Sequence, residues 1–86
     1  MTAYAYPADV VDRLRERYPE KVDAAGGDAQ FATWLLDVDR TLSRRIGFGH
    51  SDMPDRTWRD EWEAGTTARE AALDAIVEWV DNGDLG

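Results

Sequence analysis

The sequence predicts an all-α fold: a compact four-helix domain with central helices over about residues 28–46 and 67–81 and shorter helices over about 8–18 and 55–64. Three observations support this prediction. Apolar residues recur at intervals of three and four, proline, glycine and capping residues separate the segments, and no segment alternates with the period of two that is typical of strands. A chain of 86 residues is enough for one domain with a thin core.

The first helix is expected to start just after Pro7, because proline lacks only an N–H that the first turn of a helix leaves unbonded. Its predicted apolar face carries Val10, Val11, Leu14 and Tyr18. Pro19 predicts its end, because a residue before proline is disfavoured in the α conformation. Residues 19–27 close with two glycines and are expected to be a connection.

The helix over 28–46 has a stripe of apolar residues and a signal at each end. Asp28 is a natural N-cap, and Gly47 is placed to end the helix in a left-handed conformation. The predicted core-facing residues are Phe31, Trp34, Leu35, Val38, Leu42 and Ile46.

Two helices follow in the second half of the chain. Trp58 and Trp62 lie one turn apart on the segment over 55–64, which is short enough to cross the central pair obliquely. Thr67 followed by Glu70 is a capping box that opens the last helix. Its predicted buried stripe is Ala68, Ala72, Leu73, Ile76, Trp79 and Val80.

Composition excludes several classes of function. The net charge is −8, and residues 60–86 hold eight acids against one base, so direct binding to nucleic acid is disfavoured. The chain has no cysteine, which excludes disulfides and thiolate metal sites. No apolar run approaches the length of a membrane span, and residues 1–7 do not read as a signal peptide, so we expect no membrane association and a cytoplasmic location.

One segment could carry chemistry. His50, the only histidine, lies beside Ser51, Asp52 and Asp55, and carboxylates with an imidazole can bind a divalent ion or transfer protons. The alternative is that the two aspartates cap the helix over 55–64, and no second cluster completes a ligand set. The sequence therefore predicts no catalytic residue, no metal site and no cofactor.

Residues 37–72 carry a run of turn and cap signals that reads D-(L/M)-P-D, then G, then E-A-A, here as Asp52 to Asp55, Gly65 and Glu70 to Ala72. This pattern resembles a set of short uncharacterised proteins of actinobacteria and their phages. The resemblance implies a phage or actinobacterial origin and carries no known activity.

Two tryptophans and two arginines are candidates for binding a partner. Trp58 and Trp62 with Arg56 and Arg59 would form an aromatic surface framed by charge, since tryptophan is enriched in binding hot spots. The alternative is that at least one of these tryptophans packs in the core. Five arginines could also form a basic patch if the helices over 8–18 and 28–46 are adjacent: Arg13, Arg17, Arg40, Arg44 and Arg45. We expect instead that they pair with neighbouring acids such as Asp9, Glu16 and Asp37.

We therefore expect a non-enzymatic interaction protein, of the phage accessory type, that binds a bacterial host protein in the host cytoplasm. A first alternative is a DNA mimic that inhibits a nucleic-acid-binding protein through an acidic face on the last helix: Glu70, Asp74, Glu78 and Asp81. A small carrier or enzyme is a further, weaker alternative. A homodimer fits any of these functions, because small aromatic-rich bundles often bury apolar surface against a second copy.

Overall fold

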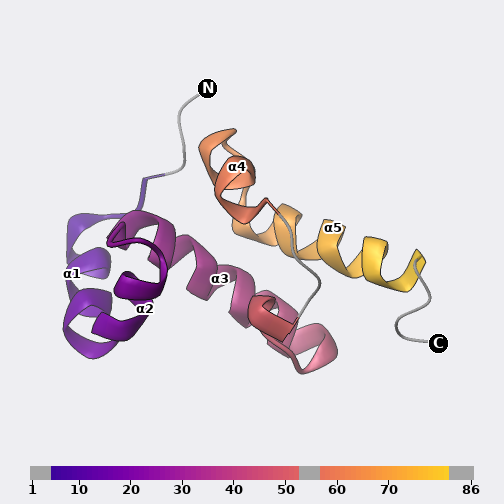
Figure 1. Ribbon diagram of the computed structural model, residues 1–86, viewed down its shortest axis with the longest axis horizontal. Helices are drawn as coiled ribbons and strands as arrows, with labels where there is room; N and C mark the ends of the chain where they lie inside the picture. Colours follow the sequence, from indigo (N-terminus) through magenta and orange to yellow (C-terminus); the bar gives the residue numbers. More distant parts are fainter. Residues whose placement is uncertain (1–4, 53–56, 82–86) are drawn as a thin grey trace.

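The computed structural model describes residues 5–52 and 57–81, and these contain helices and no strand, so the all-α prediction is confirmed. Figure 1 shows the helices in chain order. They are α1 (Ala8–Arg17), α2 (Pro19–Ala24), α3 (Ala29–Ile46), the short 3-10 helix η1 (His50–Asp52), α4 (Trp58–Glu63) and α5 (Ala68–Asp81).

The helix α2 occupies a segment that the sequence predicted as a connection, and this prediction was wrong. Pro19 ends α1 and is also the first residue of α2, a position that proline favours. Glu20 lies in the first turn, where an acid suits the helix dipole, and Val22 is buried. The buried Val22 and the favourable residues of the first turn account for this short helix.

The ends of α3 follow the predicted capping signals. The Asp28 carboxylate accepts hydrogen bonds from the backbone N–H groups of Gln30 (3.1 Å) and Phe31 (3.2 Å). Gly47 adopts the left-handed conformation at φ 77° and donates its N–H to the carbonyl of Ser43. Both predicted ends of this helix are confirmed.

In the second half of the chain, α4 starts later than predicted. Thr57 is its non-helical N-cap, so the helix begins at Trp58 and not at Asp55, which lies outside the described residues. The later start places Asp60 and Glu61 in the first turn, where the dipole favours acids. In α5, the Thr67 hydroxyl accepts a hydrogen bond from the Glu70 backbone N–H at 3.1 Å, which is one half of the predicted capping box.

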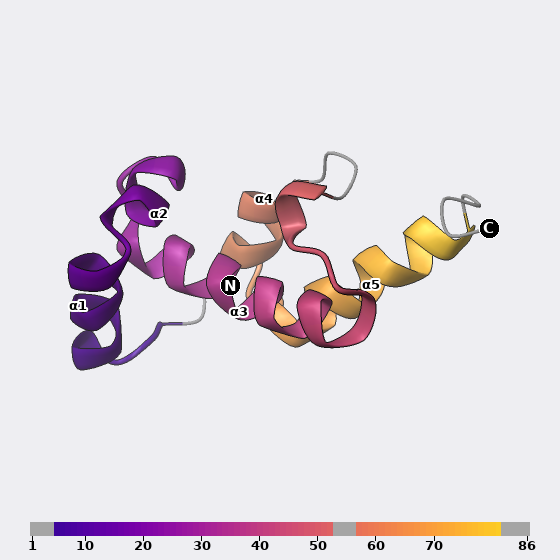
Figure 2. The same ribbon diagram turned by 90° about the horizontal axis from the view of Figure 1, so that it is seen from below.

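The centre of the fold is α3, which contacts every other helix, and its most extensive contact is with α5. Across residues 5–52 and 57–81, α1 contacts α2 and α3 but does not contact α5. Figures 1 and 2 both place α1 and α2 at one end of α3 and the last turns of α5 at the other end of the molecule. The molecule extends 40 Å along its longest axis.

The core is formed by large residues on α3 and small ones on α5. Trp34, Val38 and Leu42 are fully buried, and α5 meets them with four alanines: Ala68, Ala71, Ala72 and Ala75. Small side chains let the two helices approach closely, and the larger apolar residues of α5 are left toward the surface. Val80, predicted in the buried stripe, is 49% exposed. Val10 of α1 and Tyr18, the residue that follows this helix, are likewise exposed, so α1 buries a narrower apolar face than its spacing predicts.

Candidate functional site

The two tryptophans predicted as a binding surface pack inward. Trp62 is 9% exposed, and its ring lies 5.3 Å from that of Phe31. Trp58 is half-buried, with ring centroids 6.4 Å from Trp34 and 6.0 Å from His50. The prediction that at least one tryptophan belongs to the core is confirmed. The alternative of a joint Trp58 and Trp62 surface is corrected, because the buried Trp62 ring has almost no surface to offer a partner.

Arg59 covers this aromatic cluster. Its guanidinium lies 5.3 Å from the Phe31 ring centroid and 5.6 Å from that of Trp62. The same side chain pairs with Glu63 at 3.2 Å and with Asp28 at 3.4 Å. Arg59 therefore holds α4 on the start of α3 and has its charge matched locally, whereas Arg56 lies outside the described residues.

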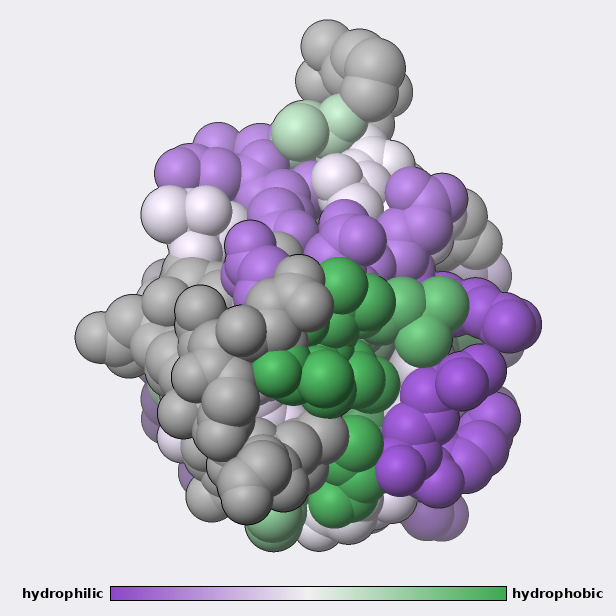
Figure 3. Space-filling model, turned by 90° about the vertical axis from the view of Figure 1, so that its right-hand side faces the viewer, coloured by the Kyte–Doolittle hydropathy of each residue, from purple (hydrophilic) through white to green (hydrophobic). Residues whose placement is uncertain are grey.

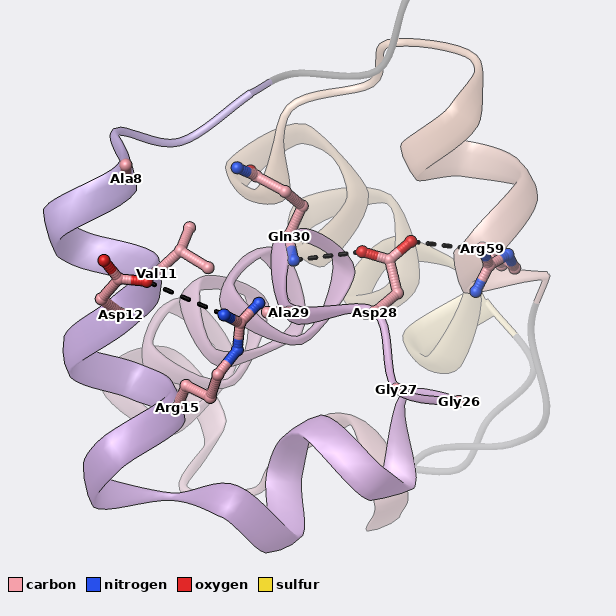
Figure 4. Close-up of a pocket in the computed structure, with 10 residues that line it drawn as sticks. All are labelled: Ala8, Val11, Asp12, Arg15, Gly26, Gly27, Asp28, Ala29, Gln30 and Arg59. Atoms are coloured by element: carbon pink, nitrogen blue, oxygen red, sulfur yellow. Dashed lines mark hydrogen bonds and ion pairs between the residues drawn. The ribbon is translucent and has the colours of Figure 1, made fainter.

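A polar hollow of about 640 Å³, here called the Asp28 hollow, opens between α1 and α4. Figure 4 shows Asp12 and Arg15 of α1 on one side, Arg59 on the other and Asp28 between them. Arg15 pairs with Asp12 at 3.8 Å, and Arg59 pairs with Asp28. Each cation of this hollow already has a carboxylate beside it, so the hollow offers little attraction to a charged ligand.

A second hollow, here called the arginine groove, lies between α1 and α3. It encloses about 390 Å³ and is less open than the Asp28 hollow. Ten residues line it: Tyr6, Val10, Arg13, Leu14, Arg17, Tyr18, Thr33, Leu36, Asp37 and Arg40. Positions spaced by three and four on each helix supply it, because such residues share a helix face. The groove has apolar walls and three arginines.

The three arginines of the groove share it with one acid, Asp37. The Asp37 carboxylate accepts a hydrogen bond from the Tyr6 hydroxyl at 3.1 Å. Within the described part of the chain, Arg13, Arg17 and Arg40 form no ion pair, so the expected pairing with neighbouring acids does not occur. The predicted basic patch is present for these three residues because α1 and α3 are adjacent. Arg44 lines a neighbouring open hollow with Arg40, and Arg45 lines neither hollow.

The histidine segment is built into the fold. One carboxylate oxygen of Asp39 lies 2.7 Å from the His50 backbone nitrogen and 2.7 Å from its ring Nδ1. Burial raises the pKa of Asp39, but the hydrogen bonds from His50 outweigh it, so the pKa lies below the ordinary value of 3.8. No sequence pattern predicted this pair, because Asp39 faces His50 only once the chain has turned back along α3.

A catalytic triad or a metal site needs further parts beside a pair such as this one. In residues 5–52 and 57–81, no serine or threonine hydroxyl hydrogen-bonds the His50 ring, as a nucleophile in a triad would. The same residues hold no cluster of three histidine or acidic side chains placed to bind a metal ion. The predicted role of Asp52 and Asp55 as helix caps cannot be followed, because the Asp52 side chain and Asp55 lie outside the described features.

The acidic face of α5 points to solvent. Glu70, Asp74 and Glu78 are exposed, and the Asp81 side chain lies outside what the structure describes. These residues step by four along the helix, on a side that is not covered by α3. None of the described helices has the length and apolar character needed to cross a membrane.

Comparison with known proteins places the chain in a phage family. It is 41% identical over 46 residues to the Gene 87 protein of Mycobacterium phage L5, which covers 54% of this chain and 87% of that relative. It is 37% identical over 47 residues to the Gene 87 protein of Mycobacterium phage D29, with 55% and 87% covered. No family model and no solved structure matches. Because these relatives are covered over most of their length, the chain belongs to the Gene 87 proteins of mycobacterial phages.

Proposed function

We propose that this protein is a small non-enzymatic interaction protein, of the phage accessory type, that binds a mycobacterial host protein through the arginine groove. One observation carries the proposal. In a chain of net charge −8, three arginines line a partly enclosed hollow together with apolar side chains, and within residues 5–52 and 57–81 none of the three forms an ion pair. The host cytoplasm is the compartment in which such a partner would be met.

The groove suits a protein segment better than the alternatives. Val10 and Leu36 supply apolar contact, and each arginine can bind a carboxylate by donating two parallel hydrogen bonds. An acidic amphipathic helix offers both complements, in the way that helices dock into hydrophobic grooves. A nucleic acid would also meet arginines here, but the net negative charge of the molecule opposes its approach.

The test is capture of partners from mycobacterial lysate with the tagged protein, at low and moderate salt. The groove variant is Arg13→Glu/Arg17→Glu. Its matched control is Lys21→Glu/Arg45→Glu, which changes the charge equally at exposed residues outside the groove. We expect one dominant protein with the wild type and the control, weakened by salt, and its loss with the groove variant. Equal capture by all three proteins would show that the groove is not the binding site.

A second candidate function rests on the acidic face. Glu70, Asp74 and Glu78 are exposed in a row along α5 and could take the place of phosphates in a DNA-binding protein. Here the informative variant is Asp74→Asn/Glu78→Gln. A nucleic-acid-binding protein that is captured by the wild type and lost by this variant would support mimicry. Unchanged capture would rule it out.

The surface formed by Trp58 and Arg59 is a narrower candidate. Trp58 is half-buried and Arg59 is already paired with two carboxylates, so a partner would gain less there than at the groove.

A further inference from the structure

The outer side of α5 is an uncovered surface with two kinds of residue. Among the described helices, α5 contacts only α3 and α4. Val77 is 57% exposed and Val80 is 49% exposed, and Leu73 is half-buried beside them. Figure 3 views the molecule from this end and shows hydrophobic side chains gathered at the centre of that face, next to a strongly hydrophilic region. Exposed apolar surface of this kind marks an interaction site.

The apolar and acidic residues of α5 lie in adjacent strips. At 100° per residue, Leu73, Val77 and Val80 fall within one sector of the helix. The acids Glu70, Asp74 and Glu78 fall in the next sector round the helix, between these apolar residues and the alanines that face α3. The outer side of α5 is therefore an amphipathic helical surface with negative charge along one edge. We name it the α5 strip.

The arginine groove has the complementary pattern. Its walls include Val10 and Leu36, and its cations are Arg13, Arg17 and Arg40. The groove lies at the end of the molecule that holds α1, whereas the last turns of α5 lie toward the opposite end of an axis of 40 Å (Figures 1 and 2). One molecule therefore cannot place its own α5 strip in its own groove, but a second copy can.

We propose that the α5 strip of one copy docks into the arginine groove of a second copy. The proposal rests on the proposed function in one respect, since it takes the groove as a receptor for an acidic amphipathic helix. If the contact is made reciprocally about a two-fold axis, it forms a closed dimer with two equal contacts. In that dimer both grooves are occupied, so a host partner must compete with self-association.

The charges argue against the simplest alternative, in which two α5 strips pack on each other. That arrangement would bring Asp74 and Glu78 of one copy close to the same acids of the other, in a pair of molecules that each carry −8. Like charges across an interface are unfavourable. Docking into the groove buries the same valines and places the acids beside arginines.

The experiment is sedimentation equilibrium of the full chain at low salt, with two reversed variants. Arg13→Glu/Arg17→Glu reverses the charge of the groove, and Asp74→Arg/Glu78→Arg reverses the charge of the α5 strip. Each variant alone should associate roughly a hundredfold more weakly than the wild type, because like charges now meet. An equimolar mixture of the two should associate again, since each reversed surface then meets its complement. Lys21→Glu/Arg45→Glu should behave as the wild type, and circular dichroism checks that every variant stays helical.

Three outcomes would overturn the inference: a monomeric wild type, unchanged association of either reversed variant alone, or a mixture that stays monomeric. None of these outcomes decides the proposed function, which is read from capture out of lysate. A monomer whose groove still captures a host protein would remove the self-docking and leave the function. If the groove variant loses self-association but still captures the host protein, the self-docking stands and the groove is not the site that binds the host partner.

Discussion

Asp39 and His50 are joined by two short contacts to a single carboxylate oxygen, at 2.7 Å from the backbone nitrogen and 2.7 Å from the ring Nδ1 of the histidine. An ionised carboxylate can only accept, so the ring nitrogen that faces it carries a proton. The pair fastens the turn after α3, with the start of η1, to the side of α3. In the same region, the His50 ring also packs edge-on against Trp58 of α4.

The first prediction concerns the pH dependence of stability. Because the pKa of Asp39 is lowered in the folded protein, its contribution is present above the unfolded value of 3.8 and is lost as pH falls through the folded value. We expect Asp39→Ala to lower the free energy of unfolding by about 1–3 kcal/mol near neutral pH, since it leaves a partly buried N–H without its acceptor. The difference from wild type should shrink below that pKa. Urea denaturation of both proteins across the acid range measures it, and a difference that does not depend on pH would contradict the assignment.

Gly49 provides the second prediction. A Cβ added there would lie 3.1 Å from the Asp39 carboxylate oxygen, so alanine forces the carboxylate to move. Gly49→Ala should destabilise the wild type by on the order of 1 kcal/mol, in the range of ordinary destabilising substitutions, and should have little effect in an Asp39→Ala background. The control is Gly47→Ala, which is strained by its positive φ of 77° whether or not Asp39 is present. Additive effects of Gly49→Ala and Asp39→Ala would show that the two positions do not interact.

The third prediction compares two buried tryptophans. The Trp34 Nε1 donates to the carbonyl of Thr66 at 3.0 Å, whereas the buried Trp62 Nε1 has no acceptor among the described residues. Trp34→Phe leaves that carbonyl without its donor, and Trp62→Phe removes an N–H that is costly to bury unpaired. Both variants lose indole volume, so the difference between them isolates the hydrogen bond. We expect Trp34→Phe to cost about 1–3 kcal/mol more in urea denaturation. Equal losses would mean that packing alone decides.

Local signals predicted most of the helical structure because they act within a few residues. The Asp28 cap, the Gly47 end and the apolar repeat of α3 each depend on neighbouring positions only, and all are found. The failure at α2 has a similar local origin. Pro19 was interpreted as a helix end, although proline is equally favoured as the first residue of a new helix.

The candidate site was harder to predict because it depends on which helices meet. The basic patch was stated as conditional on contact between the first helix and α3, and that contact selects Arg13, Arg17 and Arg40. The tryptophans illustrate the opposite case. The spacing of Trp58 and Trp62 places both on one face of α4, but it cannot say that this face lies on Phe31 and Trp34. Burial is a property of the assembled fold, so the spacing alone could not say which of the two tryptophans is buried.

The last prediction separates structural arginines from those available for binding. Arg59 stacks on Phe31 and pairs with Asp28 and Glu63. Half of its side chain is exposed, which limits the stability gained from its ion pairs. We therefore expect Arg59→Gln to lower the free energy of unfolding by about 0.5–1 kcal/mol. Arg13→Gln/Arg17→Gln removes two cations that lie one turn apart and form no ion pair among the described residues, so the change should stay within about 0.5 kcal/mol or be slightly stabilising. Urea denaturation at low and high salt checks both. A large loss of unfolding free energy in the double variant would mean that the groove arginines hold α1 on α3. The groove arginines would then serve folding and would not be available for a partner.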